Sequence, residues 1–435
     1  MKAMKLYIGS ILAGVTLLAS CTAVDYPDRF QLTPGVPSVD YVRYADRDLI
    51  IDQAAMAETV CIVGENLTSV YDLYFNDQQA SLNTSYMPAH TLIVAVPKTL
   101  PTVEDNKIHL ITRDSTVVLY DFKVLPPAPK ISGMSNEWAA EGETVTVNGS
   151  YLFAPLTVQF PGVDPIEVTD ADGDSFDVVV PAGAQPGKIK VVTASGTAQS
   201  IFMYKDSRGM LFNFDTDPHP ANHGWHAQVI ETDGTALSGN FLRLGGGGAT
   251  LDADGGWNDG AYSFEYWPGD WDDPVSYADS PRLTDYADFT KWNNMGLKFE
   301  MFIPSSDPWQ SGAMQLIIGG VDLVTGGAEG ATDIDGNTCA GANNKFISGD
   351  GLPMAPRALY RPWEATGSYD TADNWVTVTI PYTSFVYKSD GTQNDYEIKP
   401  ETFTSLTIFV WSGGVAGIEC HPVIKIDNIR AVPIK

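Results

Sequence analysis

One alternating pattern of apolar and polar residues occurs twice in the chain. Thr59–Gly64 (TVCIVG) corresponds to Thr144–Gly149 (TVTVNG) at an offset of 144 − 59 = 85 residues, and Leu67 corresponds to Leu152 at the same offset. Alternation of this kind is typical of half-buried β-strands. A period this long exceeds that of solenoid repeats, whose units share one core, so each copy should hold its own. The chain therefore contains two small β domains in tandem.

Each copy has the strand density of an immunoglobulin-like sandwich. About seven short strands, separated by Gly and Pro, fit into about 85 residues. We place the first immunoglobulin-like domain at residues 38–125 and the second at residues 126–205, with prolines at their junction to stiffen it. At about 150 residues per domain, a chain of 435 residues has room for a third.

Residues 206–435 predict a larger jelly-roll-like β-sandwich. The segment opens with LFNFD (211–215) and closes with IKIDNIR (424–430), and a jelly roll often places its first and last strands side by side. The predicted fold class is thus all-β: two tandem immunoglobulin-like sandwiches followed by this larger sandwich.

The N-terminus reads as a targeting signal. Lys2 and Lys5 precede an apolar run over residues 6–18, which is too short to span a bilayer and fits a signal peptide over residues 1–20. Leu-Ala-Ser directly before Cys21 resembles a bacterial lipobox, in which Cys21 becomes the lipidated first residue. An ordinary secretory signal with an incidental cysteine is the alternative. Residues 21–37, rich in proline, would then be a tether.

Three cysteines remain if Cys21 carries lipid. Cys61 lies in an apolar run and is predicted to be a buried strand residue. Cys339 and Cys420 could pair in an oxidising compartment. No later segment reaches about 18 apolar residues, so we expect a lipid anchor without a membrane-spanning helix.

The net charge is 26 − 54 = −28, which disfavours nucleic acid as a partner because phosphate backbones would be repelled. Anionic glycans would be disfavoured for the same reason. Neutral ligands are compatible with this charge.

Nine of the ten tryptophans lie after residue 205, in the segment predicted to form the third domain. Five of them occur among Gly, Pro, Asp and Asn, and aromatic residues in loops on a β scaffold are candidates for ligand binding. A flat indole covers the C–H face of a pyranose while polar neighbours bond the hydroxyl rim, so these residues indicate a neutral glycan. The five are Trp225, Trp267, Trp271, Trp309 and Trp363.

Three motifs contain residues of the types that bind metal ions. His219, His223 and His226 lie in a loop broken by Pro and Gly, which disfavours zinc. Residues 170–174 (DADGD) are better explained as an acidic hairpin turn than as a calcium loop. Residues 333–337 (DIDGN) leave one structural calcium open. No other cofactor is expected.

The second copy resembles the IPT/TIG family of immunoglobulin-like domains. It begins PPAPKISGM and continues AAEGETVTVNGSYL, whereas the first copy lacks the Pro-x-Ile opening. The resemblance implies spacer domains without chemistry. The matching positions are Pro129, Ile131, Gly142, Val145, Val147, Gly149 and Leu152.

The third domain resembles the C-terminal domain of Bacteroidetes surface glycan-binding proteins. The segments that carry the likeness are, in order, LKFEMFIPSSDPWQSGAMQLII, RALYRPWE, WVTVTIPYTSF and IKIDNIRAVP. The resemblance implies a non-catalytic, monomeric outer-membrane lipoprotein at the cell surface, which binds a neutral β-glycan such as xyloglucan or mixed-linkage glucan. Its implied partners are an outer-membrane glycan transporter complex and a surface endo-glycanase.

By local match to this family, the aromatic platform is assigned to Trp309, Tyr360 and Trp363. Gln310 and Arg361 are the polar neighbours expected to reach sugar hydroxyls. For Trp363, which follows a proline, packing as a wedge on the sandwich is the alternative.

Two other classes of protein stay open. A jelly-roll glycoside hydrolase would need two carboxylates about 5–10 Å apart, one with a raised pKa. Glu231 and Asp233 alternate on one strand but lack a third acid, and Asp272 and Asp273 are adjacent. A surface adhesin or structural protein would explain the repeats but not the tryptophans.

Overall fold

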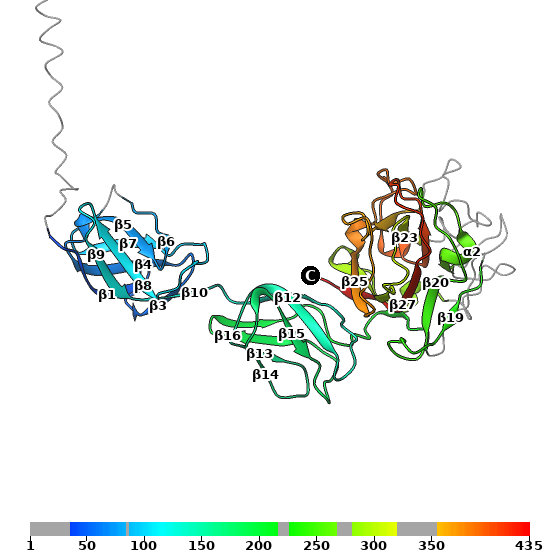
Figure 1. Ribbon diagram of the computed structural model, residues 1–435, viewed down its shortest axis with the longest axis horizontal. Coiled ribbons are helices and arrows are strands. Elements are labelled where there is room, and N and C mark those ends of the chain that lie inside the picture. The colour runs from blue at the N-terminus through cyan, green and yellow to red at the C-terminus, as the bar shows by residue number, and fades with distance from the viewer. Residues whose placement is uncertain (1–34, 84–86, 216–225, 268–280, 320–354) are drawn as a thin grey trace, which may run out of the picture. The chain divides into compact units, whose positions relative to one another are not determined.

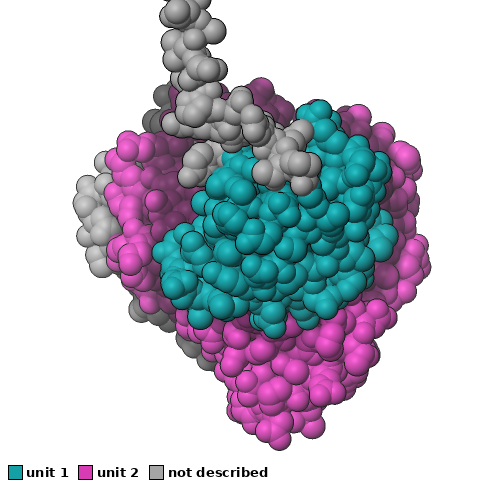
Figure 2. All heavy atoms as spheres, turned by 90° about the vertical axis from the view of Figure 1, so that its left-hand side faces the viewer, with its two compact units in different colours: residues 1–128 teal, residues 129–435 magenta. Residues whose placement is uncertain are grey.

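The computed structural model describes residues 35–83, 87–215, 226–267, 281–319 and 355–435. Strands dominate these residues, as Figure 1 shows, and the longest element labelled as an α-helix is the four-residue α2 (Asp259–Tyr262). The all-β fold class is confirmed. The chain separates into two compact units, residues 1–128 and 129–435, which Figure 2 colours teal and magenta. Within the described residues, no helix combines the length and apolarity needed to cross a membrane.

The first unit is one immunoglobulin-like domain with two four-stranded sheets, β2-β1-β4-β7 and β6-β5-β8-β9, and a small parallel pair, β10-β3. Inward side chains of both sheets share one core, and Cys61 is buried in β4 as expected. The strands are β1 (Ser38–Tyr44), β2 (Ile50–Ile51), β3 (Gln53–Ala55), β4 (Thr59–Glu65), β5 (Val70–Phe75), β6 (Gln78–Gln79), β7 (Thr91–Ala95), β8 (Lys107–Thr112), β9 (Val117–Asp121) and β10 (Lys123–Leu125).

The second unit begins with a similar domain, whose sheets are β11-β12-β15 and β14-β13-β16-β17. Its core is again formed by alternate residues of both sheets. At the start of β15, the carboxylate of Asp172 accepts the N–H groups of Asp174 and Ser175. The strands are β11 (Lys130–Met134), β12 (Thr144–Phe153), β13 (Leu156–Gln159), β14 (Ile166–Val168), β15 (Asp172–Val179), β16 (Lys190–Thr193) and β17 (Gly196–Gln199).

The repeat in the sequence corresponds to one structural feature that both domains share. Gly64 in β4 and Gly149 in β12 each lie where the first strand of the domain crosses closely. A Cβ on Gly64 would lie 1.8 Å from the carbonyl oxygen of Ser38, and one on Gly149 would lie 1.9 Å from that of Lys130. The strand pairing shifts register beside both glycines. Glycine is therefore required at both positions to allow the close approach.

The remaining residues form a larger sandwich. One sheet has the order β19-β20-β27-β22-β25, with β18 also paired to β27, and the other has the order β21-β26-β23-β24. The first and last strands pair, with Met210 opposite Arg430, which confirms the expected neighbours. The strands are β18 (Met210–Phe212), β19 (Ile230–Glu231), β20 (Phe241–Gly245), β21 (Ser263–Tyr266), β22 (Met295–Phe302), β23 (Ala313–Gly319), β24 (Arg357–Tyr360), β25 (Val376–Pro381), β26 (Ser405–Trp411) and β27 (Val423–Pro433).

A buried ion network joins the second immunoglobulin-like domain to the outer face of the β22–β27 sheet. The Glu137 carboxylate accepts hydrogen bonds from Lys298 Nζ at 2.5 Å and Arg430 Nη2 at 3.0 Å. Arg430 also donates to Glu300 at 2.7 and 3.0 Å. All four residues are at least 94 % buried, and their two negative and two positive charges cancel.

Backbone contacts surround this network and fix the same two parts together. The Glu137 N–H donates to Thr377 Oγ1 at 2.7 Å, and the Thr377 N–H donates to the Ser135 carbonyl at 2.8 Å.

Burial opposes the charge on Arg430, but Glu300 and Glu137 together hold its pKa above the usual value. Burial raises the pKa of Glu300, while the charge of Arg430 acts in the opposite direction.

We expect Glu137→Gln to destabilise the unit formed by residues 129–435 by about 3–5 kcal/mol, because it leaves buried cations without their carboxylate. Chemical denaturation followed by tryptophan fluorescence measures the change. Glu167→Gln, at an exposed position of the same domain, is the control and should stay within about 0.5 kcal/mol of wild type. Equal stability of Glu137→Gln and the control would contradict the role of the network.

Candidate functional site

The structure places two of the expected platform residues inside the sandwich. Trp309 is fully buried and Trp363 is 3 % exposed, and both belong to the main core cluster. Their indole N–H groups donate to backbone carbonyls, Trp309 to Ser311 at 2.5 Å and Trp363 to Gly312 at 2.8 Å. With the ring faces packed and the N–H groups satisfied, neither ring can stack on a sugar, so the platform role expected for both is wrong.

The other three expected residues lie at different depths. Tyr360 is half-buried and packs against Trp309, with 6.1 Å between ring centroids, and burial raises its pKa. Gln310 is half-buried, and its carbonyl accepts the Ile418 N–H at 2.9 Å. Arg361 is partly exposed and donates to the Gly413 carbonyl at 2.5 Å. Only Arg361 is therefore beside the aromatic surface described below.

Several further sequence candidates are also located. Trp267 is buried and donates to Thr407 Oγ1 at 2.9 Å. The His226 ring contacts the Glu265 carboxylate at 3.0 Å. Cys420 is buried with a free thiol. Outside the described residues lie Cys21, His219, His223, Trp225, Trp271, Asp272, Asp273, Asp333, Asp335, Asn337 and Cys339.

The outer face of the β21-β26-β23-β24 sheet carries aromatic residues that the sequence interpretation missed. In β26, Leu406, Ile408 and Val410 point into the core. Strand alternation therefore directs Phe409 and Trp411 to the opposite face. The signal in the sequence is SLTIFVW, where the face opposite the core residues ends in two aromatic residues.

Trp257 joins these two residues from a loop, and we call Trp257, Phe409 and Trp411 the Trp257 cluster. Trp257 meets Phe409 at 4.6 Å and Trp411 at 5.0 Å between ring centroids, in edge-on arrangements. Trp257 is 43 % exposed, Trp411 is half-buried and Phe409 is buried beneath them. Within the part of the chain that the structure describes, Trp257 is the one exposed tryptophan.

Backbone hydrogen bonds hold the Trp257 loop against the end of β26. The Ser412 N–H donates to the Gly255 carbonyl at 2.8 Å, and the Gly417 N–H donates to the Ala253 carbonyl at 2.6 Å. A Cβ on Gly255 would lie 2.6 Å from the Ser412 nitrogen, so glycine is needed for this approach. The loop is thereby fixed before any ligand arrives, which lowers the entropic cost of binding.

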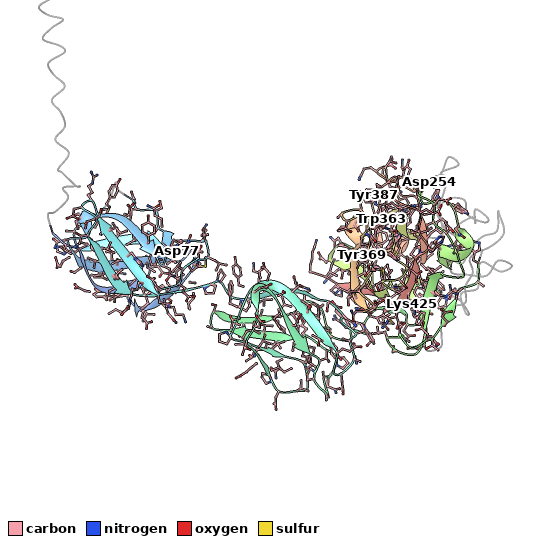
Figure 3. All side chains as sticks on the ribbon, in the orientation of Figure 1. Asp77, Asp254, Trp363, Tyr369, Tyr387 and Lys425 are labelled. Carbon is pink, nitrogen blue, oxygen red and sulfur yellow. The ribbon has the colours of Figure 1, made fainter. Side chains whose placement is uncertain are left out.

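Polar groups surround the cluster on several sides. Asp254 is exposed on the Trp257 loop, between the two residues that bond the 412–417 segment. The loop that carries Tyr387 and Asp390 comes close to Gly413 and Gly414. Figure 3 labels Asp254 and Tyr387 toward the same end of this domain as Trp363. Carboxylates and amides at such positions can bond hydroxyl groups around an aromatic surface.

A buried polar pair lies beside the cluster, on the same face of the sheet. Gln315 on β23 lies opposite Phe409 and donates to the Trp411 carbonyl at 2.9 Å and the Ser389 carbonyl at 3.1 Å. Its Oε1 accepts from Arg357 at 2.6 Å. Burial lowers the pKa of Arg357 to about 9. Gln315 thus ties the Tyr387 loop to the strand that carries the cluster.

Asp254 and Asp390 supply carboxylates in the loops next to the cluster. Hydrogen bonds from Thr392 hold the pKa of Asp390 below its usual value. Among described carboxylates, a raised pKa is found only for Glu300 and Asp427, and both are buried on the other sheet. No group of three His, Cys, Asp or Glu side chains that could hold a metal occurs in the described ranges.

Comparisons with known proteins agree with this architecture. The family model described as the surface glycan-binding protein B xyloglucan-binding domain matches residues 204–433. The crystal structure of surface glycan-binding protein PbSGBP-B from Prevotella bryantii is similar with a TM-score of 0.80 and 40 % sequence identity, covering 93 % of this chain and 100 % of that one.

A curated protein from Bacteroides ovatus shares a shorter region with the chain. It is an IPT/TIG domain-containing protein, 28 % identical over 140 residues, which are 30 % of this chain. The chain spans 28 % of the length of this curated relative. The match supports the IPT/TIG resemblance of the tandem domains.

The burial of Trp363 leads to a direct test. We expect Trp363→Ala to lower the free energy of unfolding by about 3–5 kcal/mol, because it empties a core site and leaves the Gly312 carbonyl without its donor. Thermal and chemical denaturation measure the loss. Trp257→Ala, at the exposed position, should shift stability by less than about 1 kcal/mol. The reverse order of the two variants would show that Trp363 is the surface residue.

Proposed function

Since the chain belongs to the surface glycan-binding protein B family, we propose that its C-terminal sandwich captures a neutral β-glycan at the Trp257 cluster. The observation that carries the proposal is the exposure of Trp257 (43 %), held on a preformed loop beside the half-buried Trp411 of β26. Xyloglucan and mixed-linkage glucan are the candidate ligands, because the matching family model is a xyloglucan-binding domain.

The physical basis is the pairing of an apolar ring with the apolar face of a sugar. Covering about 70 Å² of a pyranose face at ~25 cal/mol/Å² contributes about 1.5–2 kcal/mol per ring. Two rings thus supply about 3–4 kcal/mol before hydrogen bonds to Asp254 and Arg361 are added. We expect affinities on the order of micromolar to millimolar.

The net charge of −28 favours an uncharged polysaccharide over an anionic one. The exposed carboxylates around the cluster can accept hydrogen bonds from sugar hydroxyls, whereas they would repel uronic acids. A glycan without charge is therefore the ligand class that this surface suits.

We further propose that the protein binds without cleaving. A glycosidase needs one carboxyl group with a raised pKa close to a second carboxylate. The described carboxyl groups with raised pKa values, Glu300 and Asp427, are buried on the sheet opposite the cluster. This arrangement disfavours the hydrolase alternative.

Proteins of this family are cell-surface glycan-binding proteins. For this chain we propose attachment to the outer membrane through lipid on Cys21, with the tandem immunoglobulin-like domains as spacers. An outer-membrane glycan transporter complex and a surface endo-glycanase are the proposed partners. The protein would then hold polysaccharide close to its site of cleavage and uptake.

We expect Trp257→Ala and Trp411→Ala each to weaken binding to soluble xyloglucan or mixed-linkage glucan by about tenfold, since each removes one ring surface. Affinity electrophoresis with and without polysaccharide in the gel measures the change. Tyr71→Ala, which removes an aromatic residue that is 54 % exposed on the first domain, is the control and should migrate like wild type. Unchanged retardation of both tryptophan variants would rule out the cluster as the site.

We expect no new reducing ends when the protein is incubated with the polysaccharides that it binds. A colorimetric reducing-sugar assay over a day, with a β-glucanase as positive control, provides the measurement. Product formation above the blank would favour the hydrolase alternative.

A further inference from the structure

Two strands, β20 and β18, pair with different stretches of the same edge of β27. β20 pairs with β27 from Gly245 opposite Val423 to Leu242 opposite Ile426, and β18 pairs with it at Ile429 and Arg430. Asp427 and Asn428 lie between these two stretches of pairing. On the other edge, the pairing with β22 shifts register at the same place, and Asn428 has a φ of 50°. The sheet therefore has a local break, or bulge, at these two residues.

Two polar side chains at this break each bury one atom that has no hydrogen-bond partner. Asp427 is fully buried and Asn428 is 2 % exposed. The second carboxylate oxygen of Asp427, Oδ2, and the side-chain nitrogen of Asn428, Nδ2, have no partner. The first oxygen, Oδ1, accepts the Asn428 N–H at 2.7 Å. A buried carboxylate oxygen that lacks a partner is costly, and a bound ion is one means of satisfying it.

A second carboxylate lies at the same junction. Asp215 follows β18, and its carboxylate accepts the Asn240 N–H just before β20. Ser238 Oγ also donates to it at 3.3 Å, and the Asn240 side chain donates to the Phe214 carbonyl at 3.2 Å. These bonds hold the separating ends of β18 and β20 together beside Asp427. Asp215 is exposed, so the junction is open to solvent on this side.

The charges at this junction are unbalanced. Burial, together with the charges of Asp215 and Glu300, raises the pKa of Asp427 to about 8, against a hydrogen bond from the Asn428 N–H and the charge of Arg430. Arg430 is already engaged by Glu300 and Glu137. Carboxylate oxygens without a cation of their own are the donors that a hard divalent ion prefers.

We propose that the break in β27 is a calcium site, with the Asp427 and Asp215 carboxylates as its charged ligands and the Asn428 amide oxygen as a neutral one. Calcium fits better than magnesium because it accepts irregular geometry and mixed carboxylate, amide and carbonyl oxygens. The oxygen and nitrogen of a side-chain amide are assigned from their hydrogen-bond partners. Rotating the Asn428 amide by half a turn places its oxygen, instead of Nδ2, toward the ion. The site is separate from the glycan surface, and its role is to fasten β18 and β20 to β27.

Calcium binding to the full chain is measured by equilibrium dialysis, after treatment with EDTA, and thermal unfolding is followed in parallel. We expect Asp427→Asn and Asp215→Asn each to weaken binding by about tenfold or more. Saturating calcium should raise the Tm of wild type by about 5 °C and leave that of Asp427→Asn unchanged. Asp288→Asn, an exposed carboxylate in the same domain, should behave like wild type.

Thermal unfolding without calcium distinguishes a variant that has lost calcium binding from one that has lost its fold. In EDTA, Asp427→Asn should melt at or above the wild-type Tm, since it removes a carboxyl group that is costly to bury. No calcium response of wild type at millimolar calcium would overturn the proposal. So would a response that persists in Asp427→Asn and disappears in Asp335→Asn, because the ion would then bind in the 333–337 motif.

Discussion

The ion network around Glu137 is the interaction on which the arrangement of the second unit depends. Lys298, Arg430 and Glu300 belong to the large sandwich. Together they carry a net charge of one positive, because the two cations face a single carboxylate. The Glu137 carboxylate of the preceding domain supplies the missing negative charge at 2.5 and 3.0 Å. Because all four groups are buried, neither part satisfies its charges without the other. The spacer domain thereby becomes a structural component of the binding domain.

This docking gives the two sheets of the sandwich different roles. The outer face of the β22–β27 sheet is occupied by the ion network and by backbone bonds to Ser135 and Glu137. The β21-β26-β23-β24 sheet instead carries the Trp257 cluster, supported by the Gln315 side chain. The proposed ligand capture on one sheet is compatible with domain docking on the other, since the shared core separates them.

Hydrogen bonding, as much as size, determines which tryptophans are buried. Trp309 and Trp363 come from loops rich in Pro, Gly and Asp, where an exposed ring was expected. Each indole N–H found a backbone carbonyl nearby, and this allowed a large polar-edged ring to be buried at low cost. Trp257 is in a similar loop, but the backbone of that loop is fixed to the end of β26 and the residue stays partly exposed to solvent.

The sequence by itself determined the all-β class and the repeated domain with its paired glycines at Gly64 and Gly149, because alternation and tight turns are local properties of the chain. The pairing of the first and last strands of the sandwich followed from the topology typical of a jelly roll. The exposure of each tryptophan and the charge partner of Arg430 were decided only by the tertiary structure. They depend on contacts between residues as much as 293 positions apart, and local pattern carries no information about which distant carbonyl or carboxylate a side chain will meet.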